Sequence, residues 1–114
     1  MEERERRLGL NEAMFREVNE RVEDMNQTFA SVTGAFDIFC ECGDLSCTER
    51  ITVPMDVYER VRGDSTHFLL RAGHEDPTVE DVIETFDVYV VVEKAAVEAE
   101  RVAEETDPRR DDDE

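Results

Sequence analysis

Apolar residues recur at steps of three or four along the first part of the chain, and Glu and Arg fill many of the positions between them. The recurring residues are Leu10, Met14, Val18, Val22, Met25 and Phe29. This spacing is typical of an amphipathic helix with one apolar face. It predicts a helix over Asn11–Phe29 whose apolar face packs on the core. The repeat is too short to favour a coiled coil instead.

The pattern changes to strict alternation after the helix breaker at 31–34. The residues on one parity are Phe36, Ile38, Cys40 and Cys42, and Ile51 and Val53 continue the pattern after a loop. Alternation of this kind is typical of half-buried strands. We therefore expect a hairpin over Ala35–Val53 that is closed by the loop holding the cysteines.

Shorter elements are expected after the hairpin. Pro54 can occupy the first position of a helix, and Gly63 can end it, which predicts a short middle helix with Met55, Tyr58 and Val61 on its apolar face. His67–Arg71 has the composition of a strand and is followed by the turn-forming sequence AGHEDP. The segment TVEDVIETFDVYVVVEK predicts two further strands, one on each side of Asp87.

The last strand and the last helix complete the predicted fold. Val88–Val92 is apolar on both faces, as a central strand of a sheet would be, and Ala95–Thr106 has the composition of a helix. We predict an α+β fold with N-terminal, short middle and C-terminal helices and a small, largely antiparallel sheet. The single domain should span 11–106, between a flexible N-terminus at 1–10 and a disordered acidic tail at 107–114.

Charge and length limit the functions that fit this chain. With 114 residues and a formal net charge of -18, it has room for one modest core and lacks the clustered Lys and Arg that bind phosphate backbones. Nucleic acid and anionic membranes are therefore not expected as partners. We expect the partner to be another protein. No signal peptide or membrane span is apparent, so we expect a cytoplasmic protein.

All three cysteines of the chain, Cys40, Cys42 and Cys47, lie within eight residues. The cytosol keeps thiols reduced, which argues against a structural disulfide. Side chains at i and i+2 of a strand project from the same face, so Cys40 and Cys42 converge, and the turn residues after Cys42 allow Cys47 to approach them. Three converging thiolates point to a structural zinc site that needs a fourth ligand.

Either histidine could supply that ligand. His74 lies in a Gly-His-Glu turn, where Glu75 could accept a hydrogen bond from the second ring nitrogen, and we prefer it to His67, which begins a strand. Asp44 and Glu49 are weaker oxygen alternatives. Iron–sulfur ligation would need four thiolates and is less favoured. The ordinary alternative is that free cysteines pack as small apolar side chains.

Several separated motifs resemble a group of small uncharacterised proteins and appended domains from actinobacteria. They are a CECG-x-x-x-C knuckle, an aromatic-Glu-x-Val-Arg helix, a GHE turn and a VVEK strand, and the resemblance covers the chain from FREVNERVEDMN onward except the acidic tail. It implies that Cys40, Cys42, Cys47 and His74 fall on recurring positions of the group. The chain departs from the group at RAG, before the histidine, and at TFD, before the last strand. The resemblance implies no activity.

We predict a small non-enzymatic zinc-binding domain in which structural zinc stabilises a protein-interaction or regulatory module. One alternative is a thiol-based redox or metal sensor that loses zinc on oxidation. A second is a zinc hydrolase or deaminase, with water as the fourth ligand and Glu41 or Glu75 as the proton shuttle. The sequence lacks the HExxH and HxE…PCxxC motifs of such enzymes.

Overall fold

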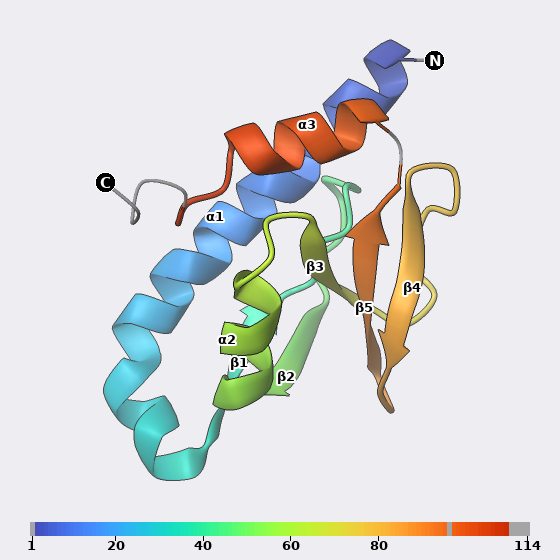
Figure 1. Ribbon diagram of the computed structural model, residues 1–114. Helices are drawn as coiled ribbons and strands as arrows, with labels where there is room; N and C mark the ends of the chain where they lie inside the picture. Colours follow the sequence, from blue (N-terminus) through green and yellow to red (C-terminus); the bar gives the residue numbers. More distant parts are fainter. Residues whose placement is uncertain (1, 96, 110–114) are drawn as a thin grey trace.

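The structure is a computed structural model that describes residues 2–95 and 97–109, without the side chains of 2, 28–31 and 98. The described residues form three helices and five strands, which confirms the α+β class (Figure 1). In chain order these elements are α1 (Glu2–Thr33), β1 (Ala35–Phe39), β2 (Arg50–Pro54), α2 (Met55–Arg62), β3 (His67–Arg71), β4 (Glu80–Thr85), β5 (Tyr89–Lys94) and α3 (Val97–Glu105).

The strands form two antiparallel sheets rather than the one we predicted. β1 and β2 form the predicted hairpin, with Phe39 opposite Arg50 where the cysteine loop begins. The second sheet has the order β3-β5-β4, so the strand predicted to be central is central. Tyr89 to Val92 are buried, as expected for that position, whereas Val88 precedes the strand and is exposed.

The chain just after β1 connects the two sheets. The backbone N–H of Glu41 donates to the carbonyl of Leu69 in β3 over 2.9 Å. The backbone N–H of Arg71, also in β3, donates to Sγ of Cys40 over 3.2 Å. The first two cysteines therefore lie along the outer edge of the three-stranded sheet.

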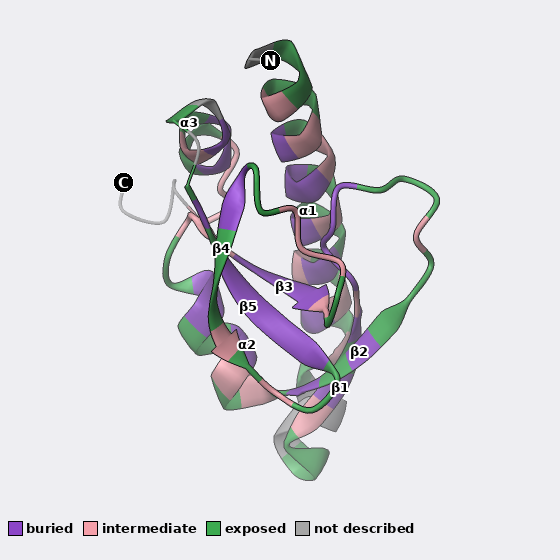
Figure 2. Cartoon of the chain, turned by 90° about the vertical axis from the view of Figure 1, so that its right-hand side faces the viewer, coloured by how far each residue is buried: buried purple, intermediate pink, exposed green. Residues whose placement is uncertain are grey.

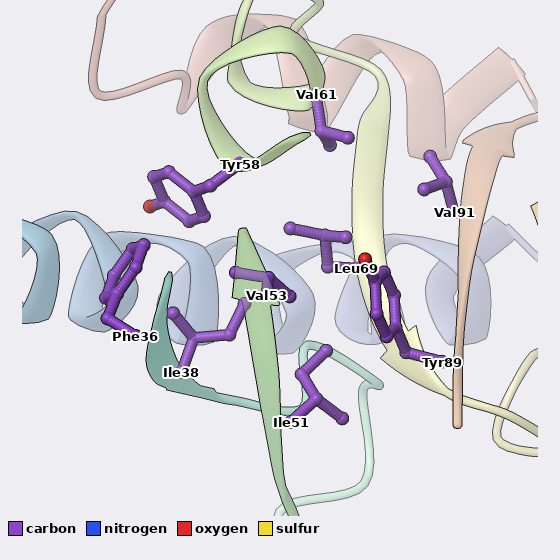
Figure 3. Close-up of a cluster of buried hydrophobic side chains, with 9 residues drawn as sticks. All are labelled: Phe36, Ile38, Ile51, Val53, Tyr58, Val61, Leu69, Tyr89 and Val91. Atoms are coloured by element: carbon purple, nitrogen blue, oxygen red, sulfur yellow. The ribbon is translucent and has the colours of Figure 1, made fainter. Parts of the chain in front are cut away.

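Apolar side chains from both sheets and from α2 form one buried cluster, shown in Figure 3. Its members are Phe36, Ile38, Ile51, Val53, Tyr58, Val61, Leu69, Tyr89 and Val91. The rings of Phe36 and Tyr58 meet edge to face, with centroids 5.2 Å apart. The predicted inward parity of the hairpin and the predicted apolar face of α2 are thus confirmed, with Met55 only partly buried.

The predicted orientation of α1 is wrong. Met14, Val18 and Met25 are exposed, and Met25 retains 78% of its accessible surface. Figure 2 shows exposed and buried residues alternating along α1. The side of α1 that faces the domain is polar instead, and its buried polar residues are Glu12, Arg16, Asn19 and Glu23. Val22 is half-buried against the apolar cluster, and the side chain of Phe29 is outside the described part of the chain.

Each buried polar residue on α1 has at least one partner inside the domain, although Nε of Arg16 has none, and this explains the reversal. Arg16 donates to the carbonyls of Ser65 and Ala103 and lies over the ring of Phe68. Asn19 donates to the carbonyl of Phe39 and accepts a hydrogen bond from its N–H, both over 2.8 Å. A satisfied buried polar group no longer carries the full cost of desolvation, so the polar face can pack inward.

Both ends of the described chain pack on the domain. Residues 2–10, for which we expected a flexible N-terminus, form the first turns of α1, and Arg4 pairs with Asp76 over 2.7 Å. At the other end Arg109 pairs with Glu20 over 2.7 Å. The remainder of the predicted acidic tail, 110–114, lies outside the described residues. No helix in the described part of the chain has both the length and the apolar character to span a bilayer.

Candidate metal centre

Cys40, Cys42, Cys47 and His74 come together in space. One ligand atom from each lies within 4.8 Å of the other three, close enough for the four to hold one metal ion. Cys40 and Cys42 follow β1, Cys47 lies in the loop before β2, and His74 lies in the turn between β3 and β4. Residues from two separate turns and a sheet edge thus meet at one point.

The distances at this point match tetrahedral coordination. Nδ1 of His74 lies 3.5 Å from Sγ of Cys40 and 3.6 Å from Sγ of Cys47. Zinc bonds of about 2.3 Å to sulfur and about 2.0 Å to nitrogen, set at the tetrahedral angle, separate the two donors by about 3.5 Å. These two distances are therefore compatible with one metal ion bound by the nitrogen and both sulfurs.

The loop between Cys42 and β2 is ordered by its own polar groups. The carboxylate of Asp44 accepts hydrogen bonds from the N–H and the hydroxyl of Ser46, over 2.9 and 2.7 Å. The N–H of Cys47 donates to the Asp44 carbonyl over 3.0 Å. Glu49 pairs with Arg71 over 3.5 Å. Both oxygen alternatives thus have other partners, and neither belongs to the four-residue group.

Gly43 lets this loop pack directly on α1. A Cβ at this position would overlap the side chain of Leu8, so a larger residue would require either that side chain or the loop to move. Nδ2 of Asn11, one turn along α1, donates to the Gly43 carbonyl over 3.0 Å. The N-terminal part of α1 therefore positions the cysteine loop, which the sequence analysis did not anticipate.

The turn that carries His74 depends on Gly73, whose φ of 91° lies in the left-handed region that favours glycine. The N–H of His74 donates to the Arg71 carbonyl over 3.0 Å. The carboxylate of Glu75 accepts from the N–H of Gly73 over 3.1 Å and so stabilises the same turn. Its predicted hydrogen bond to the His74 ring stays a prediction.

His67 lies in a different cluster. Its Nε2 is 3.5 Å from Oδ2 of Asp64, which precedes β3, and 3.3 Å from Oε2 of Glu93, the partner of His67 on β5. The structure therefore places His74, and not His67, beside the cysteines, in agreement with the preference drawn from the sequence.

Without a metal ion, the thiols share protons unequally. The hydrogen bond from the Cys42 thiol lowers the pKa of Cys40. Donating that hydrogen bond raises the pKa of Cys42 well above its ordinary value, and burial raises it further. Burial also raises the pKa of Cys47. A metal ion that binds all three sulfurs must therefore displace protons from at least Cys42 and Cys47.

Glu41, between the first two cysteines, follows β1 and is fully buried. Its carboxylate accepts hydrogen bonds from Nη2 of Arg62 over 2.8 Å and from Nδ2 of Asn19 over 2.7 Å. It also accepts one from the N–H of Leu69 over 3.0 Å. From the sequence, Glu41 was considered as a proton shuttle and as an acidic neighbour of the thiolates, and not as a buried counter-ion. The alternation that places the two cysteines on one face of the chain places Glu41 on the other face. The sequence pattern could therefore have predicted that Glu41 points away from the sulfurs.

A surface pocket of about 470 Å³ borders the site, with Cys42 and His74 in its wall. The carboxylates of Glu12 and Glu80 also contribute to its lining. Both contact Nζ of Lys94, and all three side chains are almost completely buried. The four ligand residues therefore border a solvent-accessible pocket. The buried ionic group of Glu12, Glu80 and Lys94 borders the same pocket.

No model of a known protein family matches the chain, and neither a curated protein nor a solved structure matches it. What the site can do chemically is therefore inferred from its four donors. Three cysteine sulfurs and one imidazole nitrogen are close enough to hold a metal ion.

Proposed function

We propose that the chain is a small non-enzymatic domain in which Cys40, Cys42, Cys47 and His74 hold a structural zinc ion. The observation that carries the proposal is the spacing of the donors, with Nδ1 of His74 at 3.5 and 3.6 Å from two sulfurs. Thiolate and imidazole donors suit zinc, and a three-cysteine, one-histidine set is a common structural zinc site.

A complete set of four protein donors supports a structural role over a catalytic one. Catalytic zinc sites keep a position for water or substrate, whereas His74 fills that position here. Glu41, one of the two proton shuttles considered for a hydrolase, is turned away from the sulfurs and bonded to Arg62. The hydrolase or deaminase alternative therefore lacks both its vacant ligand position and one of its shuttles.

Zinc at this position would join the cysteine loop to the His74 turn, two segments that are otherwise held mainly by polar contacts. Binding free energies of roughly 10–16 kcal/mol in small zinc domains exceed the usual net stability of a domain of this size. The cysteine loop has mostly exposed side chains from Asp44 to Arg50, so apolar burial contributes little to its order. We infer that the metal fixes this loop and the His74 turn on the edge of the sheet.

The domain most readily serves as a protein-interaction or regulatory module in the cytoplasm. The formal net charge of -18 opposes binding to nucleic acid or to an anionic membrane, which supports a protein partner.

Metal content of purified variants tests the proposal. The wild-type chain should contain one zinc ion per molecule, and Cys47→Ser and His74→Ala should lose it. His67→Ala is the matched control and should keep it, because its ring lies in the other cluster. Retention of full zinc in His74→Ala, or loss of zinc in His67→Ala alone, would contradict the ligand set.

One observation favours the sensor alternative. Cys47 is only partly buried, so an oxidant can reach its sulfur. Zinc release by mild peroxide, followed by uptake when a reductant is added, would support a sensor. Stable metal under the same treatment would support a purely structural role.

A further inference from the structure

The outer side of α1 carries an apolar stripe that no other described element covers. Its residues are Leu10, Met14, Val18, Met25 and Val32, exposed by 38 to 82%. At about 100° per residue, Met14, Met25 and Val32 lie within about 20° of one another, diametrically opposite the buried Glu23. The stripe extends over about 33 Å of helix. An exposed apolar surface of this length marks an interaction site.

The helix cannot turn this stripe into its own core. Its opposite face is fixed by Arg16, which donates to the Ala103 carbonyl, and by Asn19, which donates to Glu41. Rotation about the helix axis would leave these buried partners without their hydrogen bonds, which is costly inside a protein. The stripe therefore remains outside in the folded chain and is available to another molecule.

Charge on the stripe indicates which molecule covers it. Two ion pairs lie alongside the apolar residues, Arg7 with Glu3 and Arg21 with Glu17. These four charges sum to zero, although the whole chain carries -18. A site for a strongly basic partner would be acidic, whereas a balanced site suits a partner with the same balanced pattern.

We propose that the partner is a second copy of the chain, packed antiparallel along the α1 stripe. In a two-fold arrangement centred between Val18 and Arg21, Met14 of one copy lies opposite Met25 of the other. The same arrangement brings Glu17 near Arg21 of the second copy, in both directions. The arrangement thus pairs methionine with methionine at two symmetric points and opposite charges at two more, so the stripe is complementary to itself in charge. This inference is independent of the metal.

Sedimentation velocity over a range of concentrations tests the proposal on the purified chain, with and without added zinc. The wild-type chain should associate reversibly to twice the mass of one chain. Met14→Glu combined with Met25→Glu should remain monomeric, because it places four charges in the apolar contact. Both residues are exposed, so zinc content and helical circular dichroism should not change. Ile83→Glu, an exposed apolar residue on β4, is the matched control and should still associate.

Charge exchange tests the antiparallel register. Glu17→Arg alone should weaken association by about tenfold, because the introduced guanidinium of each copy then lies near Arg21 of the other. Adding Arg21→Glu should restore it. A wild-type chain that is monomeric at every concentration would overturn the proposal, even if the stripe bound a helix of another protein. Dimers that survive the methionine substitutions would overturn it as well.

Discussion

The carboxylate of Glu41 accepts two hydrogen bonds of 2.8 Å from Nη2 of Arg62 in the interior of the domain. Both residues are almost completely buried, and Nε and Nη1 of Arg62 have no hydrogen-bond partner. The positive charge of Arg62 therefore depends on Glu41 for compensation. Because Glu41 separates Cys40 from Cys42, this ion pair also fixes the direction in which the two sulfurs project.

Replacing Glu41 with glutamine should destabilise the domain strongly. The substitution leaves Arg62 as a buried charge without a counter-ion, which typically costs about 3–5 kcal/mol. Urea denaturation of the zinc-loaded protein would measure the loss. Glu84→Gln is the control, because it breaks the exposed ion pair with Arg60 and should cost at most about 1 kcal/mol. Equal effects of the two substitutions would contradict this role for Glu41.

Removal of the metal should disorder the cysteine loop and the His74 turn before the rest of the domain. Backbone amide resonances of 40–47 and 71–76 should broaden or shift when a strong chelator is added, and the unfolding free energy should fall by several kcal/mol. Cys47→Ser should already show this state, and the chelator should change it no further. Unchanged spectra of the wild-type chain would show that metal does not stabilise these segments.

Metal affinity should fall steeply as the pH is lowered. The pKa of Cys42 is raised by its hydrogen bond to Cys40 and by burial, and burial raises the pKa of Cys47. Both thiols therefore hold protons in the metal-free chain near neutral pH. Zinc must displace two protons, so the apparent affinity should drop by about 100-fold for each unit of pH below neutrality. Competition with a chelating dye at several pH values would measure this slope. A pH-independent affinity would exclude thiolate ligands.

Lys94→Met should make the domain sensitive to high pH. Burial raises the pKa of Glu80 to about 7 and lowers the pKa of Lys94 to about 7, and their direct contact favours the charged pair. Without Lys94, no cation in the described contacts lies against the carboxylates of Glu80 and Glu12. A carboxyl whose pKa is raised on folding contributes stability below its unfolded pKa, and that contribution disappears as the pH rises through about 7.

Denaturation midpoints at about pH 5 and about pH 8 would test this dependence. The Lys94→Met variant should lose most of its stability at the higher pH. Arg71→Met, which removes a partly exposed ion pair with Glu49, is the control. Its stability should differ little between the two pH values. A Lys94→Met variant that is equally stable at both pH values would contradict the role of Lys94 as the counter-ion.

Most of the fold was predictable because the strands and α2 follow ordinary periodicity. β3 spans His67–Arg71 as expected, and the apolar run after Asp87 forms the central strand β5. The orientation of α1 was not predictable by the same rule. Periodicity identifies an apolar face, but it does not show that Arg16 and Asn19 have buried partners 20 or more residues away in the sequence.

The candidate site was predictable to a similar extent. Close spacing identified the three cysteines, and the glycine turn identified His74. The contribution of α1 could not be found in the same way, because the hydrogen bond from Asn11 to Gly43 joins residues that no local motif relates. Long-range polar contacts of this kind depend on tertiary packing, which residue spacing does not encode.

X-ray absorption spectroscopy at the zinc edge tests the central claim most directly, because it counts the donor atoms around the ion. The spacing of Cys40, Cys42, Cys47 and His74 predicts three sulfur atoms at about 2.3 Å and one nitrogen at about 2.0 Å from zinc. A shell of nitrogen and oxygen atoms alone, or a purified chain without bound metal, would contradict it.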